Sequence, residues 1–357
     1  MGFFKNLFSF LSQDMAIDLG TANTLVLLKN KGIVINEPSV VAIRINKSGQ
    51  EEILAVGQEA KDMVGKTPGT IKAIRPMKDG VIADFNTTEM MIEYFIKKVN
   101  ASSFLSSPRI VICVPYGLTQ VERKAVRESA LNAGARSVYL IEEPMAAAIG
   151  AGLPVHEPNG NLVVDIGGGT TEIGVTSLNG LVISKSIRIA GDKLDAAIMD
   201  YVKKNFNLLI GDRVAENLKI EIGTAIKLDE PLTTIVKGRD QLEGSLKSIE
   251  INSEHIREAI ADPLEQITDA LKSVLEETPP ELAGDIVENG IVLTGGGSLI
   301  RGLDKYLAEE VKLPVYIADE PLLAVAKGTG KALEQIDILQ QINYEDWYRW
   351  KKEVYYF

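Results

Sequence analysis

The sequence has little of the chemistry on which disulfide-bonded and zinc-binding proteins depend, because its 357 residues include one cysteine and two histidines. Cys113 cannot form an intramolecular disulfide, which favours a reducing compartment, and its apolar neighbours predict a core position. His156 and His255 lack ligand-spaced partners, so zinc or histidine chemistry is not expected. No apolar run reaches the roughly 18–20 residues that a membrane-spanning helix needs. The apolar N-terminal stretch has polar interruptions and no cleavage pattern, so a secretory signal is not expected.

A basic block is also missing. The 38 lysines and arginines are outnumbered by 49 aspartates and glutamates, giving a net charge of −11, so nucleic acid is not expected as a partner. A hydrophobic fraction of 45% and a charged fraction of 24% exclude disorder, collagen and coiled coil as the main state. The length fits about two domains of roughly 150 residues. We therefore expect a cytoplasmic protein with a large core.

Strand-like and helix-like segments alternate along the chain, which predicts an α/β fold. β-rich runs predict strands at residues 15–18, 24–28, 39–45, 52–56, 109–114 and 138–141. Helical spacing and capping signals predict helices at residues 87–100, 120–132, 144–150, 193–205 and 212–227.

An internal repeat predicts duplicated halves. In each copy a strand ends in an aspartate, a glycine turn follows, and a hairpin comes next; the aspartates are Asp18 and Asp165. We expect two related α/β halves facing each other across a cleft. Residues 33–74 and 191–254 are the expected insertions into them.

The two glycine turns have the composition of phosphate-binding loops. Glycine lets backbone N–H groups approach phosphate oxygens closely, and aspartates such as Asp18 and Asp165 are hard ligands for Mg²⁺, directly or through water. A bulged hairpin without a ligand would explain one copy, but two copies favour nucleotide binding. The loop candidates are Gly20, Thr21, Ala22, Asn23, Gly167, Gly168, Gly169 and Thr170.

A third glycine loop follows an expected strand at residues 291–294 and is expected to open a helix. Its backbone amides could face a phosphate or pack beneath a nucleoside. The spacing matches neither a P-loop nor a dinucleotide fingerprint. Its candidate residues are Gly295, Gly296, Gly297 and Ser298.

These blocks resemble the actin–Hsp70–sugar-kinase superfamily of ATPases, and most closely the bacterial actins of the MreB family, over about residues 15–335. The matching segments are residues 17–24, 36–41, 74–77, 79–84, 143–150 and 209–211. The resemblance implies an actin-like ATPase fold with two duplicated α/β halves around a nucleotide cleft. It also implies ATP and Mg²⁺ as cofactors, assembly into filaments, and slow hydrolysis after assembly.

The resemblance divides the chain into subdomains. Subdomain IA comprises residues 14–32, 75–152 and about 325–340, and IB comprises 33–74. Subdomain IIA comprises residues 153–190 and 255–324, and IIB comprises 191–254. An amphipathic membrane-binding helix at 1–13 precedes them, and an aromatic tail at 341–357 follows.

The residues alone allow two interpretations of Glu143. It is either a carboxylate at a helix N-terminus, where the helix dipole favours negative charge, or the group that orients water for attack on the γ-phosphate. The family's water-positioning acid directly precedes a proline, so the resemblance assigns the role to Glu143 rather than Glu142. Thr170 is the candidate second contact to that water. Glu216 and Lys219 form either a surface ion pair on one helix or, as the resemblance implies, contacts to the ribose and base.

The N-terminal segment predicts an amphipathic helix on an anionic membrane surface, because six apolar residues share one helical arc and no acid precedes Asp14. A helix docked on the protein itself or a disordered tail remains the alternative. The six residues are Phe3, Phe4, Leu7, Phe8, Phe10 and Leu11. Phe104 and Leu105 lie in a serine-rich loop that resembles a membrane-insertion loop of the family.

Residues 344–357 hold seven aromatic residues, and here the chain departs from the family. A partner surface, a membrane surface and packing onto the protein are all open for this tail. The resemblance implies a filament at the inner face of the cell membrane that works with cell-wall elongation membrane proteins to maintain rod shape. The alternatives are an organelle-aligning or segregating bacterial actin, a small-molecule kinase, or a chaperone ATPase domain.

Overall fold

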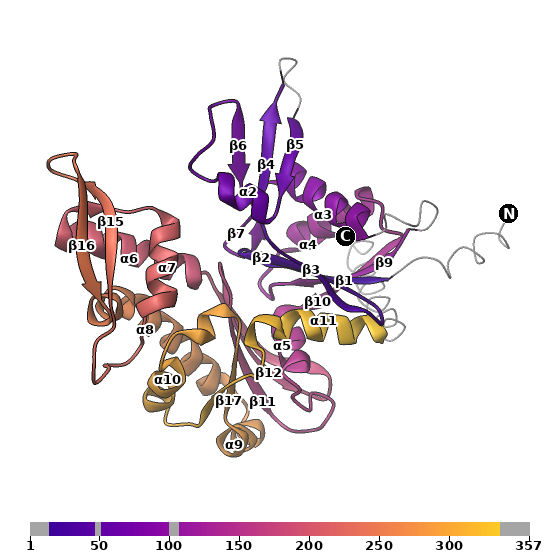
Figure 1. Ribbon diagram of the computed structural model, residues 1–357. Coiled ribbons are helices and arrows are strands. Elements are labelled where there is room, and N and C mark those ends of the chain that lie inside the picture. The colour runs from indigo at the N-terminus through magenta and orange to yellow at the C-terminus, as the bar shows by residue number, and fades with distance from the viewer. Residues whose placement is uncertain (1–13, 47–50, 100–106, 336–357) are drawn as a thin grey trace, which may run out of the picture. The chain divides into compact units, whose positions relative to one another are not determined.

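The computed structural model describes residues 14–46, 51–99 and 107–335, which form two compact units. The first unit runs to Gly150 and resumes at Val325, and the second is Ala151–Ala324. Each unit is built around a five-stranded sheet (Figure 1). The expected α/β fold is therefore confirmed.

The sheet of the first unit has the order β10-β9-β1-β2-β3. Strand β1 runs antiparallel to β2 and parallel to β9, which is parallel to β10. The strands are β1 (Met15–Leu19), β2 (Asn23–Leu28), β3 (Gly32–Pro38), β9 (Arg109–Val114) and β10 (Ser137–Glu142). The central strands β1 and β9 are almost entirely buried, as parallel strands covered on both faces are.

Helices pack against this sheet. They are α3 (Phe85–Val99), α4 (Gln120–Asn132), α5 (Glu143–Gly150) and α11 (Ala324–Glu334). The expected start of α4 is confirmed, since Thr119 and Glu122 form a capping box in which each side chain accepts from the other residue's backbone N–H.

A smaller sheet in the order β5-β4-β6 is inserted into the first unit. Its elements are β4 (Val41–Ile45), β5 (Glu51–Val56), α2 (Gln58–Met63) and β6 (Ile71–Ile74), followed by the two-stranded β7 (Met77–Lys78) and β8 (Val81–Ile82). Strand β3 pairs with β2 in the larger sheet, so the chain leaves that sheet only after Pro38.

The second unit repeats the topology of the first. Its sheet order β18-β17-β11-β12-β13 has the same pattern of antiparallel neighbours on one side and parallel neighbours on the other. The strands are β11 (Asn161–Ile166), β12 (Thr171–Ser177), β13 (Gly180–Ile187), β17 (Ile291–Thr294) and β18 (Val315–Ile317). The duplication predicted from the repeat is therefore confirmed.

The helices of the second unit are α6 (Gly191–Phe206), α7 (Asp212–Ile222), α8 (Ser253–Glu277), α9 (Pro280–Asn289) and α10 (Leu303–Val311). The expected helix at residues 212–227 is wrong at its end, because Thr224 leaves the helix to bridge Arg301. The third glycine loop opens a 3₁₀ turn, η2 (Gly296–Leu299), rather than an α-helix; a second turn, η3 (Pro321–Leu323), precedes α11.

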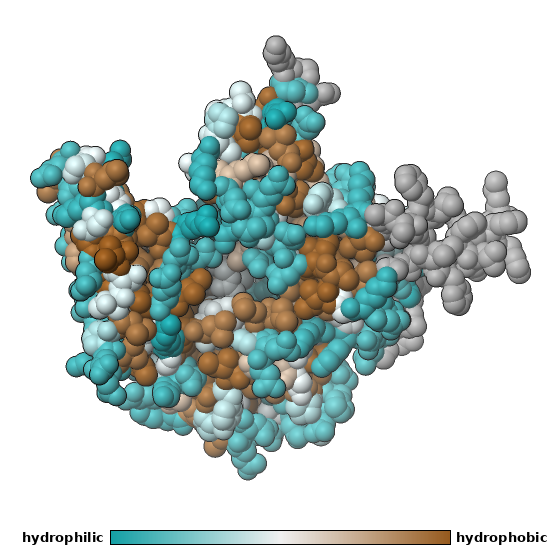
Figure 2. Space-filling view, viewed as in Figure 1, coloured by the Kyte–Doolittle hydropathy of each residue, from teal (hydrophilic) through white to brown (hydrophobic). Residues whose placement is uncertain are grey.

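A three-stranded sheet is inserted between α6 and α8, with β14 (Leu208–Leu209), β15 (Thr233–Asp240) and β16 (Leu246–Asn252). Large apolar residues are exposed on the β15–β16 hairpin, namely Ile235, Leu242 and Leu246, the last at 92%. Figure 2 shows brown hydrophobic atoms among hydrophilic ones in this region.

Several expectations lie outside the described residues: the N-terminal helix, the pair Phe104 and Leu105, and the aromatic tail. Within the described ranges, no helix combines the length and the apolar character needed to cross a bilayer.

Candidate nucleotide-binding residues in the two units

The first glycine loop connects β1 to β2 and is held by hydrogen bonds on both sides. A side chain at Gly20 would place its Cβ 2.6 Å from the carbonyl oxygen of Asn23, so only glycine fits. The Ser39 hydroxyl donates to the Gly20 carbonyl at 2.6 Å, and the backbone N–H of Gly80 donates to the Thr21 hydroxyl at 3.2 Å. These contacts fix the loop before any ligand arrives.

Asp18 and Glu143 lie at the same edge of the first sheet. Asp18 pairs with Cys113, which pairs with Ile141 two residues before Glu143. Because β1, β9 and β10 are parallel, their carboxyl ends form one edge, which is where α/β sheets bind ligands. Asp18 is 9% and Glu143 8% exposed, and Cys113 is buried as expected.

The two adjacent glutamates have different surroundings. Glu142 ends β10 and accepts a hydrogen bond from the Arg123 guanidinium at 2.8 Å in a partly exposed ion pair. Glu143 opens α5 and is buried. The ion pair holds Glu142 toward α4, whereas Glu143 is the buried carboxylate of the two at the sheet edge.

The second glycine loop, residues 167–170, connects β11 to β12 and packs on the start of α6. The Gly167 N–H donates to the Thr170 carbonyl at 2.9 Å. The backbone N–H groups of Gly191 and Asp192 donate to the carbonyls of Gly167 and Gly168 at 3.1 and 2.8 Å. The loop therefore satisfies donors at a helix start that would otherwise lack partners.

Asp165 is buried at the end of β11, at 6% exposure. The Thr294 hydroxyl donates to its Oδ1 at 2.7 Å. Burial raises the pKa of Asp165 to about 6, and the Thr294 hydrogen bond offsets only part of this rise. A dehydrated carboxylate of this kind is stabilised by a nearby cation, so Asp165 fits the expected Mg²⁺ role.

Lys219 does not form the simple surface pair with Glu216 that was one of the two expectations. Its ammonium lies 2.8 Å from Asp195 Oδ1 on α6 and donates to the Gly191 carbonyl at 3.0 Å. Burial raises the pKa of Asp195, Lys219 opposes the rise, and Glu216 and Asp192 add to it. Lys219 thus ties α7 to the start of α6, beside the second glycine loop.

The third glycine loop packs directly on the end of β11. A Cβ on Gly295, whose φ is +78°, would clash with the Ile166 carbonyl oxygen, and one on Gly297 would clash with Ile166 Cγ2. Ser298 is fully buried, and its hydroxyl donates to the Gly295 carbonyl at 2.7 Å. The glycines therefore bring the loop against the strand that carries Asp165.

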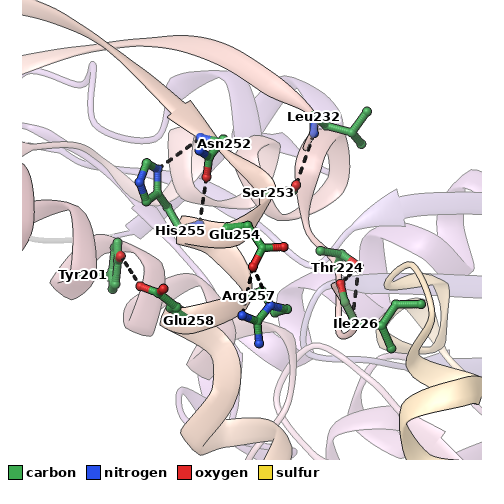
Figure 3. Close-up of polar contacts among 10 residues, drawn as sticks. All are labelled: Tyr201, Thr224, Ile226, Leu232, Asn252, Ser253, Glu254, His255, Arg257 and Glu258. Carbon is green, nitrogen blue, oxygen red and sulfur yellow. Dashed lines mark hydrogen bonds and ion pairs between the residues drawn. The ribbon is translucent and has the colours of Figure 1, made fainter. Parts of the chain in front are cut away.

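Arg301 and Thr224 connect this loop to α7, and neither residue belongs to a motif visible in the sequence. Arg301 Nη1 donates to the carbonyls of Ile220 and Gly223 at 3.2 Å each. The Thr224 hydroxyl lies 3.2 Å from the Arg301 carbonyl and 2.8 Å from that of Ile226, the second contact being drawn in Figure 3. No local pattern marks either residue, because the contacts of Arg301 with Thr224, Ile220 and Gly223 each join residues about 80 positions apart in the chain.

Two sheets of the same topology, each with a buried aspartate at a strand end before a glycine loop, define the actin-like nucleotide-binding fold. A model of the MreB/Mbl protein family matches residues 12–341. The chain is 57% identical over 337 residues to the cell shape-determining protein MreB of Escherichia coli (strain K12), covering 94% of this chain and 96% of that protein. It is 50% identical over 328 residues to the cell shape-determining protein Mbl of Bacillus subtilis (strain 168), covering 92% and 98%. The chain belongs to the MreB/Mbl family.

Solved structures agree with this assignment. MreB5 of Spiroplasma citri bound to ADP superposes with a TM-score of 0.86 at 39% identity, covering 92% of this chain and 98% of that one. The MamK double helical filament matches with a TM-score of 0.75 at 22% identity, covering 90% and 99%. The second likeness shows the fold alone.

Proposed function

We propose that this protein is a bacterial actin that binds ATP, assembles into filaments and determines cell shape. The observation that carries the proposal is the pair of buried strand-end aspartates with glycine loops, in a family whose relatives are cell shape-determining proteins. MreB5 of Spiroplasma citri binds ADP and AMPPNP in its crystal structures. Membership of this family favours the cell-shape role over an organelle-aligning filament or a kinase.

Each unit carries its own candidate contacts to the nucleotide. Residues 20–23 and 167–170 would bind the phosphates through backbone N–H groups. Residues 295–298 would pack beneath the adenosine, and Glu216 would reach the ribose from α7, which Lys219 holds in place. Asp18 and Asp165 would hold Mg²⁺ or its water shell, and bound Mg²⁺ supplies positive charge at the phosphate oxygens.

Hydrolysis would depend on Glu143. Its carboxylate would accept a hydrogen bond from the attacking water and hold that water in line with the γ-phosphate, with Thr170 as the second contact. Burial favours this role because a carboxylate with few competing water molecules orients one of them more strictly. Slow hydrolysis after assembly would then let the filament lose stability with age.

Assembly tests the proposal directly. With ATP and Mg²⁺, the purified full-length chain should form filaments that sediment and are visible by electron microscopy, and without nucleotide it should stay in the supernatant. A chain that binds ATP but never assembles would overturn the proposal.

The β15–β16 hairpin is a candidate subunit contact, because its exposed leucines would gain from burial against a second copy. Full burial of one leucine contributes roughly 1.5–3 kcal/mol. Leu242→Ser with Leu246→Ser should therefore raise the concentration needed for assembly at least about tenfold. Leu178→Ser, which alters another exposed leucine in a hairpin turn, is the matched control and should leave assembly unchanged.

We further propose that the filament lies on the inner face of the cell membrane, where it would guide cell-wall elongation membrane proteins. Burial of the six apolar N-terminal residues is partial in an interface and ordering them costs entropy, so one copy binds weakly. Filaments multiply such weak contacts. Polymer should therefore co-float with anionic liposomes while monomer largely does not.

Two variants locate the anchors. Deleting residues 2–12 should abolish flotation of the polymer, and Phe104→Ser with Leu105→Ser should weaken it. Both variants should still sediment as filaments with ATP. Full flotation after the deletion would instead assign the anchor to the aromatic tail.

A further inference from the structure

The amino-terminal edge of the first sheet lies opposite the edge that carries Asp18 and Glu143. Strands β1, β9 and β10 all begin there, and the antiparallel register of β1 with β2 places the β2–β3 turn beside the start of β1. Met15 pairs with both Leu28 and Ile110. Five neighbouring strands therefore bring residues from four separate stretches of chain to one edge (Figure 1).

Three cations are exposed along this edge. Lys29 and Lys31 lie in the β2–β3 turn, and the Lys29 N–H donates to the Asp14 carbonyl at 3.1 Å. Arg136 directly precedes β10, and its N–H donates to the Pro108 carbonyl at 2.8 Å. Across the described ranges none of the three side chains forms an ion pair.

Asp14, the acidic residue just before β1, is neutralised by an ion pair with Arg109. Asp14 Oδ2 lies 2.6 Å from Arg109 Nη2, and a second nitrogen of the same guanidinium donates to it at 3.0 Å. The aspartate and arginine side chains are 11% and 23% exposed. The three cations therefore give this edge a net positive charge in a chain whose net charge is −11.

The edge is also where both segments predicted to contact a membrane join the fold. Asp14 directly follows residues 1–13, and Pro108 lies two residues after residues 100–106. The Pro108 carbonyl accepts a hydrogen bond from the Arg136 N–H, and the Asp14 carbonyl accepts one from the Lys29 N–H. The three cations therefore lie beside the residues at which these two segments join the fold.

We propose that Lys29, Lys31 and Arg136 bind the phosphate headgroups of anionic phospholipids and turn this edge of the sheet toward the membrane. The inference rests on the proposed membrane association and adds to it the side chains that contact the headgroups and a docking orientation. Lysine attracts phosphate as a point charge, and arginine bonds it in a bidentate fashion. With this edge on the lipid, the edge carrying Asp18 and Glu143 points away from it.

Partitioning of the full-length chain without nucleotide, below the assembly concentration, tests the inference. Because one copy binds weakly, it is measured by titrating vesicles to high lipid concentration. Lys29→Gln, Lys31→Gln and Arg136→Gln are combined, and vesicles of equimolar phosphatidylcholine and phosphatidylglycerol are compared with phosphatidylcholine alone. Each cation near an anionic surface is worth about fivefold in partitioning, so the triple variant should lose on the order of 100-fold at low salt. Binding to neutral vesicles should not change, and added salt should remove the difference.

A matched control variant is Arg44→Gln with Lys66→Gln and Lys72→Gln, which removes the same charges from exposed positions in the inserted segment of the first unit. It should partition like the parent chain. Equal partitioning of edge and control variants on anionic vesicles would overturn the inference, as would a loss confined to binding of duplex DNA.

The outcome separates this inference from the proposed function. A parent chain that floats with no vesicle, even as polymer, would overturn membrane association itself. A parent that floats on neutral and anionic vesicles alike would keep membrane association and overturn only the headgroup site. Sedimentation with ATP confirms in each case that the variants fold and assemble.

Discussion

Glu143→Gln should slow phosphate release by on the order of 10²–10⁴ while leaving ATP binding and filament formation in place. The amide keeps the size of the carboxylate, so the packing at the start of α5 is preserved. It loses the negative charge that would hold the attacking water. Single-turnover phosphate release, measured beside sedimentation of the same sample, separates hydrolysis from assembly.

Glu142→Gln is the matched control, because it makes the same chemical change one residue earlier. The substitution removes the ion pair with Arg123. The Glu142 and Arg123 side chains are 32% and 25% exposed, and exposed ion pairs contribute about 0–1 kcal/mol to stability. Phosphate release should therefore stay near that of the parent chain. If the two variants release phosphate at the same reduced rate, the assignment of the water-orienting role to Glu143 is wrong.

Asp165→Asn should have two opposite effects on stability. Without metal and nucleotide, the variant should be more stable than the parent near neutral pH, because the buried carboxylate is ionised there at a cost. With ATP and Mg²⁺, the parent should gain thermal stability and the variant should gain much less. The Thr294 hydroxyl can still donate to the asparagine oxygen, so the change removes mainly the charge.

The pH dependence follows from the raised pKa. The folded-state pKa of Asp165 is about 6, above the usual 3.8, so the protonated carboxyl stabilises the folded state. This contribution to the free energy of unfolding is fully present below about pH 4 and is lost as the pH rises through 6. The difference amounts to on the order of 2–3 kcal/mol at pH 7. Thermal unfolding in EDTA at pH 4 and pH 7 should show the gap between parent and variant opening at the higher pH.

Asp262→Asn removes an exposed carboxylate from α8 and should change neither measurement. Full magnesium-dependent stabilisation of Asp165→Asn by ATP would rule out the metal assignment. Equal stability of parent and variant in EDTA at pH 7 would show that burial of Asp165 is less unfavourable than its surroundings indicate.

The sequence by itself determined the elements whose causes are local. The strand–aspartate–glycine repeat predicted the duplication, because the tight turn that glycine permits after a buried strand is a local feature of a few residues. Thr119 predicted the start of α4 as an N-cap, and in the structure it closes a capping box with Glu122 within four residues. The role of Glu143 rested on family resemblance, and the structure adds its burial and the ion pair of its neighbour.

Only the tertiary structure decided which distant residues meet. Lys219 pairs with Asp195 on another helix, and Arg301 accounts for the early end of α7 from about 80 residues away. Such contacts, and the dehydration that raises the pKa of Asp165, depend on packing between elements, which local propensity and periodicity do not encode. The edge formed by Lys29, Lys31 and Arg136 likewise exists because sheet order and register bring separate strand ends together.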